Sequence, residues 1–236
     1  MKPFSRILGW HALIYFSIVL IIYLFHFTEF RWTEYFTKPL VLIVLLRYFF
    51  IAGGNLHPGV RKGIVLGVVF SILSDFSFLL RTDISQWFIG GTFIFSLLAM
   101  YAYAAGFQFT PVKYLSLVDF KTITPINLFL SLLIIIFPIT IFIIEDLEFW
   151  QYPAILYQLL LWFLVSQGLK RQDNVNETSY YLVLSGIVMY SITTMLITLQ
   201  NFTHEFFDFR GIPVFTYFTS QFLMLVGAVH QNPKLD

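Results

Sequence analysis

The stretch that decides the fold is residues 63–80, GIVLGVVFSILSDFSFLL, in which Asp75 is the single charged residue. A helix needs about 20 mainly apolar residues to cross the hydrocarbon core of a bilayer, and this stretch is close to that length. At 1.5 Å per residue its helix would be about 27 Å long. The stretch therefore predicts a transmembrane helix with one ionisable group inside it.

Seven further stretches have the same apolar character, so the sequence predicts eight membrane-spanning helices in all. The connections between them are short and leave no room for a soluble domain. We therefore expect residues 1–236 to form a single transmembrane domain, an all-α polytopic membrane helix bundle. The eight predicted spans are 10–27, 39–54, 63–80, 87–107, 126–144, 149–169, 179–199 and 212–230.

The composition supports a membrane protein and excludes several other classes. Charged residues make up 11% of the chain, whereas a soluble domain carries about 25%. The 14 Lys and Arg nearly balance the 13 Asp and Glu, so we expect no nucleic-acid partner. The chain has no cysteine, which excludes a disulfide framework and a thiol nucleophile. Of all the charged residues, only Arg47 and Asp75 lie within the predicted spans.

The basic residues of the loops predict the orientation, because cytoplasmic loops carry the excess of Lys and Arg. Nine basic residues lie on the side that includes both termini and four on the opposite side, which predicts cytoplasmic termini. The first group is Lys2, Arg6, Arg61, Lys62, Lys113, Lys121, Lys170, Arg171 and Lys234. The second is Arg31, Lys38, Arg81 and Arg210.

An ionisable side chain inside a span is expensive and indicates either a site or a buried pair. Ser71 and Asp75 are four residues apart and share a helix face, so they predict a polar stripe that points into the bundle. Arg47 lies near the middle of its predicted span and keeps its proton, so it requires an anion, carbonyls or water. Lys38 lies at the outer end of the same span. Asp75 is either functional or a structural carboxylate paired with Arg47 or Lys38.

The last two predicted spans bring polar side chains to the height of Asp75. Thr193, Thr194 and Thr198 approach the outer end of one span, and Tyr217 and Gln221 share a face of the other. Hydrogen bonding between helices is the structural alternative for each of them. Their convergence favours a polar site near the outer leaflet.

Metal chemistry fits the sequence poorly, because a zinc site needs about three ligands at one place. The five histidines divide between the two membrane sides. We therefore predict neither a metal site nor a cofactor. The histidines are His11, His57 and His230 on the cytoplasmic side, and His26 and His204 on the other.

Three short motifs resemble the YhhN family of lysoplasmalogenase-like membrane proteins. They are Thr37-Lys38-Pro39-Leu40, Ser71-Ile72-Leu73-Ser74-Asp75 and Tyr217-Phe218-Thr219-Ser220-Gln221. The resemblance extends from about Arg31 to His230 and implies eight helices with both termini on one side. It also implies hydrolysis of the vinyl ether bond of lysoplasmalogens, which releases a fatty aldehyde and a glycerophospho-base. Lys38, Asp75, Tyr217 and Gln221 match the family's site positions.

The sequence departs from the family pattern at three positions. Ser74 precedes the aspartate where the family has Gly, Met100 takes the place of an intramembrane His, and Thr194 takes the place of a second Asp. Hydrolysis of a vinyl ether needs a general acid and a base. Only one carboxylate, Asp75, lies within the predicted spans.

Two functions follow from this pattern. The first is a lysoplasmalogenase-like hydrolase in which Asp75 exchanges a proton, while Tyr217 and Gln221 position water. Lys38 or Arg47 would hold the lipid phosphate. The alternative is a non-catalytic protein that binds or transports a single-chain amphiphile. For either function we expect a multi-pass protein of the bacterial inner membrane, whose partners are a lysophospholipid or similar amphiphile and the bilayer. The residues expected to contact the lipid are Lys38, Arg47, Ser71, Met100 and Thr194.

Overall fold

A computed structural model describes residues 3–26, 34–83, 88–108, 151–172, 174–202 and 211–231. The secondary structure of these residues is helical, apart from turns and short connections. The helices are α1 (Pro3–His26), α2 (Glu34–Ala52), α3 (Pro58–Asp83), α4 (Phe88–Gln108), α6 (Gln151–Leu169), α7 (Glu177–Phe202) and α8 (Ile212–Val229).

These helices correspond to seven of the predicted spans, which confirms the helical membrane bundle. The predicted span 126–144 lies outside the described residues. Four helical segments are long and apolar enough to cross a membrane: Pro58–Leu80, Phe88–Phe107, Glu177–Ile197 and Ile212–Val229. The chain is therefore a multi-pass membrane protein, whereas eight spans and their orientation remain predictions. Helices α1, α2 and α3 begin before the apolar stretches, because a helix can continue into polar residues beyond the hydrocarbon core.

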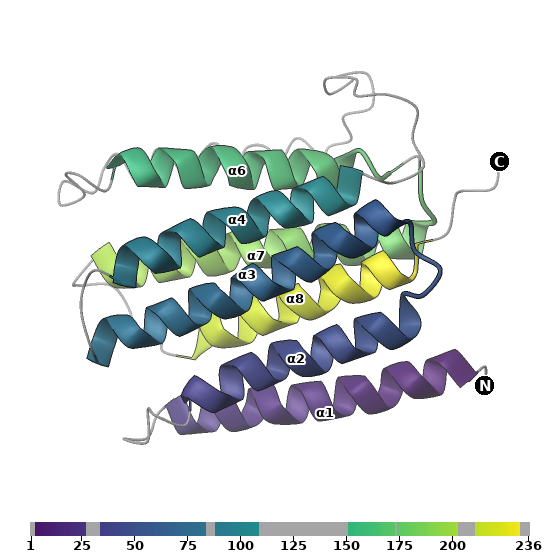
Figure 1. The fold of residues 1–236 in the computed structure, drawn as a ribbon, viewed down its shortest axis with the longest axis horizontal. Coiled ribbons are helices and arrows are strands. Elements are labelled where there is room, and N and C mark those ends of the chain that lie inside the picture. Colours follow the sequence, from purple (N-terminus) through teal and green to yellow (C-terminus); the bar gives the residue numbers. More distant parts are fainter. Residues whose placement is uncertain are drawn as a thin grey trace.

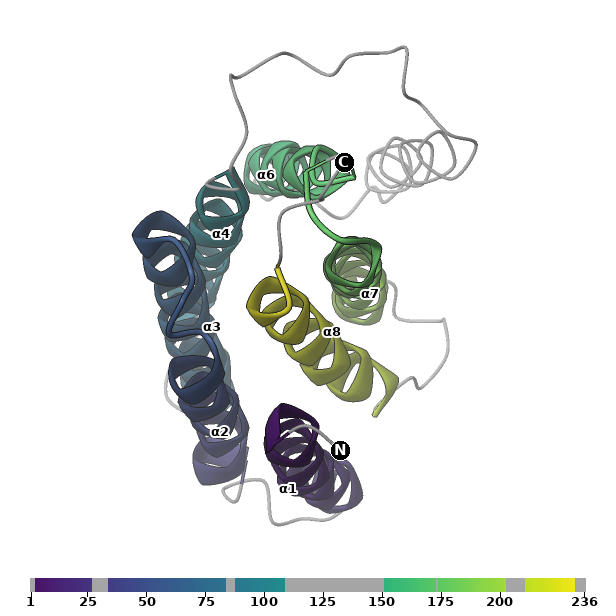
Figure 2. The same cartoon turned by 90° about the vertical axis from the view of Figure 1, so that its right-hand side faces the viewer.

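The helices lie side by side along the long axis of the bundle (Figure 1). The end-on view in Figure 2 shows α8 at the centre, with α2, α3 and α4 along one side, and α1, α6 and α7 around the rest. In agreement, 56% of the apolar segment of α8 is buried inside the bundle, which is the largest share among the four candidate spans. Side chains on α8 are therefore well placed to meet side chains from several other helices.

Glycines allow two helix pairs to approach closely, as small residues commonly do in membrane bundles. A Cβ atom at Gly63 of α3 would overlap the backbone of Gly106 in α4. In the other pair, a Cβ atom at Gly186 of α7 would lie 2.8 Å from the backbone nitrogen of Met224 in α8. These crossings belong to the two most extensive helix contacts, α3 with α4 and α7 with α8.

The turn between α6 and α7 holds a buried arginine. Arg171 is fully buried, and its guanidinium donates hydrogen bonds to Gln231 Oε1 (3.1 Å) and Ser179 Oγ (2.9 Å). It also lies 5.2 Å from the ring centroid of Phe107. We call Arg171, Phe107, Ser179 and Gln231 the Arg171 cluster. The cluster joins the ends of α4, α7 and α8 to the turn.

Burial acts against the charge of this arginine. It lowers the pKa of Arg171 to about 10, which still leaves the guanidinium charged at neutral pH. Its Nε atom has no hydrogen-bond partner within the described part of the chain. The hydrogen bonds and the Phe107 ring therefore offset only part of the desolvation of Arg171.

Candidate functional site

Asp75 lies on the face of α3 that meets α8, and the residue as a whole is neither fully buried nor exposed. The hydroxyl of Tyr217, on α8, donates a hydrogen bond to Asp75 Oδ2 over 3.2 Å. Lys38, on α2, attracts the carboxylate electrostatically. The other carboxylate residues of the described helices, Glu34, Asp83 and Glu177, lie at helix ends. Asp75 is thus an acid placed away from the helix ends, inside a bundle that is mainly apolar.

A buried amide, Gln221, lies one helical turn after Tyr217 on α8. Gln221 Oε1 accepts a 2.5 Å hydrogen bond from the hydroxyl of Tyr103, on α4. Gln221 Nε2 donates to Ser71 Oγ at 3.5 Å, and Ser71 is also within hydrogen-bonding range of the hydroxyls of Tyr103 and Tyr217. The oxygen and the nitrogen of the amide therefore both have a hydrogen-bond partner, which fixes the orientation of the side chain. We call Asp75, Ser71, Tyr103, Tyr217 and Gln221 the Asp75 group.

Helix geometry explains why these side chains converge. Ser71 and Asp75 are one turn apart on α3, and Tyr217 and Gln221 are one turn apart on α8, so each pair presents two polar groups to the other helix. Tyr103 reaches the group because α3 carries a glycine opposite it. A Cβ atom at Gly67 would lie 2.5 Å from the Tyr103 ring.

Thr194 belongs to a neighbouring cluster of hydroxyls. Its Oγ1 atom donates to the backbone oxygen of Tyr190 and lies 3.2 Å from the hydroxyl of Tyr157, on α6. The Tyr157 hydroxyl is also within hydrogen-bonding range of Tyr190. The ring of Tyr190 connects this cluster to the Asp75 group, because its centroid lies 6.3 Å from that of Tyr217. Thr194 is therefore part of the surroundings of the Asp75 group.

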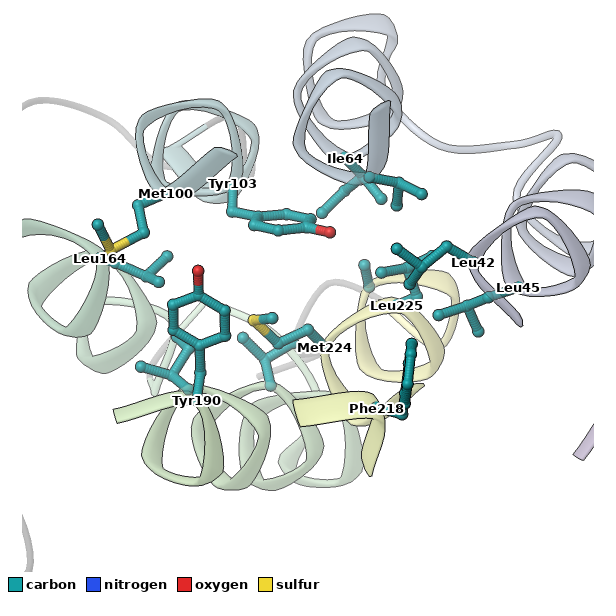
Figure 3. Close-up of a cluster of buried hydrophobic side chains, with 14 of the residues drawn as sticks. Leu42, Leu45, Ile64, Met100, Tyr103, Leu164, Tyr190, Phe218, Met224 and Leu225 are labelled. Carbon is teal, nitrogen blue, oxygen red and sulfur yellow. The ribbon is translucent and has the colours of Figure 1, made fainter. Parts of the chain in front are cut away.

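Met100 is fully buried in the apolar core, one turn before Tyr103 on α4. Figure 3 shows both side chains leaving α4, with Met100 directed toward Leu164 of α6. On the opposite side, Tyr190 points from α7 toward α4. Met100 thus contributes apolar packing next to the Asp75 group and offers no proton.

The structure does not bring Arg47 to the Asp75 group. Arg47 is exposed on α2, whereas Lys38 is half-buried and lies on the side of α2 that faces Asp75. The two residues are nine positions apart, which is about two and a half helical turns, so their side chains leave opposite sides of the helix. Asp75 is consequently not paired with Arg47. Of the two cations, Lys38 interacts with the charge of Asp75 and Arg47 does not.

Two members of the arrangement were not among the predicted site residues. Tyr103 shares a helix face with Met100, and that spacing was the available signal. Tyr190 is one turn before Thr194. The sequence alone does not distinguish a tyrosine that forms hydrogen bonds at this position from one that only packs. No group of three His, Asp or Glu side chains that could hold a metal is found in the described ranges.

Comparison with known proteins agrees with the motifs. The chain matches the model of the YhhN family over residues 33–228. No curated protein and no solved structure is similar enough to this chain to match.

Proposed function

Since the chain belongs to the YhhN family, we propose that it is a lysoplasmalogenase-like membrane hydrolase. It would cleave the vinyl ether bond of a lysophospholipid to a fatty aldehyde and a glycerophospho-base. The observation that supports this most strongly is Asp75, a carboxylate within α3 that accepts a hydrogen bond from Tyr217 of α8. An acid in a mainly apolar interior suits a substrate with a reactive bond next to a long apolar chain.

One carboxylate is sufficient for the reaction if it acts twice. Protonated Asp75 transfers its proton to the vinyl carbon remote from the ether oxygen, and the π electrons of the double bond form the new C–H bond. The resulting oxocarbenium ion is attacked by water, which returns a proton to the Asp75 carboxylate. The hemiacetal then moves its hydroxyl proton to the ether oxygen, and the C–O bond breaks to give aldehyde and alcohol. Asp75 ends in its starting form.

Tyr217 and Gln221 are the proposed positioning groups for the carboxylate and the water. The Tyr217 hydroxyl donates to Asp75, which stabilises the carboxylate that remains after proton transfer. The Gln221 amide is held by Tyr103 and Ser71, so its orientation does not have to be acquired during the reaction. A water molecule next to these two residues would be on the same side of the bundle as the acid.

Lys38 is the proposed contact for the lipid phosphate. Its ammonium lies 6.0 Å from the ring centroid of Phe78 and close enough to Asp75 to interact with its charge. A phosphate at Lys38 and an alkyl chain along the interior would bring the vinyl ether between them to Asp75. Met100 and Thr194 would lie next to the alkyl chain of the lipid.

The membrane arrangement belongs to the same proposal. We infer eight spans, with both termini in the cytoplasm of a bacterium whose inner membrane holds the protein, from the apolar stretches and the basic loops. The first turn of α1 and the last turn of α8 lie at the same end of the bundle, as this arrangement requires (Figure 1). Asp75 would then lie nearer the outer leaflet.

The test is aldehyde release from a lysoplasmalogen by the purified protein in detergent. Asp75→Asn keeps the shape of the side chain but removes its acid–base function, so kcat should fall about 10²–10⁴-fold. Ser74→Ala is the matched control. The Ser74 hydroxyl interacts with Thr92 and Ser96 of α4, and its loss should change kcat by less than about twofold.

Absence of aldehyde above the blank, from well-folded wild-type protein, would contradict the hydrolase proposal. If that protein nevertheless binds the lysoplasmalogen, the amphiphile-binding function becomes the better description. Equal rates for wild type and Asp75→Asn would retain the hydrolase but remove Asp75 from the reaction.

A further inference from the structure

One side of α2 is exposed along its whole length and contains an arginine. The opposite side is buried and mainly apolar, with Lys38 near its start and the hydroxyl of Tyr48, so the exposed residues form a continuous stripe that faces away from the bundle. We call this stripe the outer face of α2. It comprises Phe36, Leu40, Ile43, Arg47, Phe50 and Ile51, and its buried counterpart comprises Val41, Leu42, Leu45, Tyr48 and Phe49.

The charge of Arg47 is unfavourable on an apolar face that contacts lipid, unless an anion binds next to it. A guanidinium does not lose its proton in proteins, and a charged side chain within a span is expensive unless it reaches polar groups. Among the described residues no carboxylate pairs with Arg47. Arg47 precedes the end of α2, Ala52, by about 8 Å at 1.5 Å per residue. A long side chain can cross that distance to the level of the lipid phosphates.

A second guanidinium lies at the same end of the bundle. Arg61, in the first turns of α3, is exposed, and its guanidinium carbon lies 5.4 Å from the ring centroid of Phe50. Phe50 is three residues after Arg47 and therefore its neighbour on the outer face of α2. Two cations thus flank one aromatic ring, and the apolar stripe continues from them toward the other end of α2.

This arrangement is complementary to one class of molecule, an amphiphile with an anionic head and an alkyl chain. We propose that the outer face of α2 binds one anionic glycerophospholipid. Its phosphate lies between Arg47 and Arg61, and an acyl chain follows Ile43, Leu40 and Phe36. This site is separate from the Asp75 group, because Arg47 and Lys38 leave opposite sides of α2. It does not depend on the proposed hydrolysis.

A second copy of the chain suits this face less well. A two-fold interface centred on α2 would place Arg47 opposite Arg47 of the other copy, and like charges repel strongly where water is scarce. A phospholipid supplies the missing negative charge and covers the apolar residues at the same time.

Native mass spectrometry of the full-length protein, released from detergent with dioleoyl phosphatidylglycerol, tests the proposal. Wild type should retain one phosphatidylglycerol and bind it at least about fivefold more tightly than dioleoyl phosphatidylcholine. Arg47→Gln should weaken phosphatidylglycerol binding roughly tenfold, the loss expected for one charged hydrogen bond. Arg61→Gln should also weaken it, whereas Lys62→Gln, an exposed neighbour, should change it by less than about twofold.

Arg47→Lys keeps the charge and should stay within about threefold of wild type, which provides a second variant if Arg47→Gln folds poorly. Three results would overturn the proposal. They are equal binding of the two lipids by wild type, unchanged binding in Arg47→Gln, and displacement of the lipid by millimolar inorganic phosphate. A lipid-free dimer that Arg47→Gln stabilises would instead assign the outer face of α2 to a second copy.

Discussion

Asp75 and Arg171 are both ionisable residues inside the bundle, but their surroundings differ. Asp75 is partly exposed, and its carboxylate accepts a hydrogen bond from a phenol that also lies near Ser71. Arg171 is fully enclosed, and it has two fixed hydrogen-bond partners and an aromatic ring. Among the described residues, the first environment engages one oxygen of the carboxylate, Oδ2, whereas the second engages both terminal nitrogens of the guanidinium.

The difference teaches how a buried charge can be assigned a role. The partners of Arg171 belong to the ends of three helices, so its interactions hold those ends together. Asp75 accepts its hydrogen bond from Tyr217 of α8, and Lys38 of α2 attracts its charge, so these interactions converge on a single carboxylate within α3. We therefore expect substitutions at the Arg171 cluster to change stability, and those at the Asp75 group to change activity.

The largest effect on stability is expected for Arg171→Ala. The substitution leaves a void beside Phe107 and removes the hydrogen bonds to Ser179 and Gln231, so the free energy of unfolding should fall by roughly 2–4 kcal/mol. Thermal unfolding in detergent measures the change. Lys170→Ala is the adjacent control and should alter stability by less than about 0.5 kcal/mol. If the two variants unfold at the same temperature, Arg171 does not hold the helix ends together.

The next effect is on activity. Tyr217→Phe removes the hydrogen bond to the Asp75 carboxylate without changing the ring, and should lower kcat about tenfold, or about 1.4 kcal/mol. Initial rates of aldehyde release measure it. Tyr15→Phe is a matched control, because the Tyr15 hydroxyl donates to the backbone oxygen of Phe218. It should reduce stability while leaving kcat within about twofold. If Tyr15→Phe lowered kcat and Tyr217→Phe lowered only stability, the Asp75 group would not be the part of the bundle that determines activity.

The smallest effect is expected for Ser179→Ala. The Ser179 hydroxyl accepts from Arg171 and donates to the backbone oxygen of Gly227, so its loss should reduce the free energy of unfolding by about 1 kcal/mol. Kinetic constants should not change. Thr178→Ala, at an exposed neighbouring position, should be neutral. A change in KM for Ser179→Ala would show that the Arg171 cluster communicates with the substrate site.

The helical membrane bundle was predictable from the apolar stretches of the sequence, whereas the hydrogen bond between Tyr217 and Asp75 was not, because it joins residues 142 positions apart. The spacing of Ser71 with Asp75, and of Tyr217 with Gln221, identifies one face of each helix. The exposure of Arg47 was also within reach, since its spacing from Lys38 places the two on opposite sides of one helix.

The roles of Tyr103 and Arg171 could not be predicted in the same way. A tyrosine among small residues is as compatible with packing as with hydrogen bonding, and Tyr103 reaches Gln221 only because α3 has Gly67 at that level. A basic residue in a turn normally lies at the membrane surface. Arg171 is buried because α4, α7 and the end of α8 meet around it, and that arrangement depends on contacts distant in sequence.

The glycine crossings have a consequence for how the Asp75 group is held. α3 with α4, and α7 with α8, form two closely packed pairs, whose backbones meet at Gly63 with Gly106 and at Gly186 with Met224. Asp75 lies on one pair and Tyr217 on the other, so long side chains rather than touching backbones connect them. The hydrogen bond from Tyr103 to Gln221 is a second connection of the same kind. Conservative substitutions in the Asp75 group can therefore alter the contact between the two pairs without disturbing either glycine crossing.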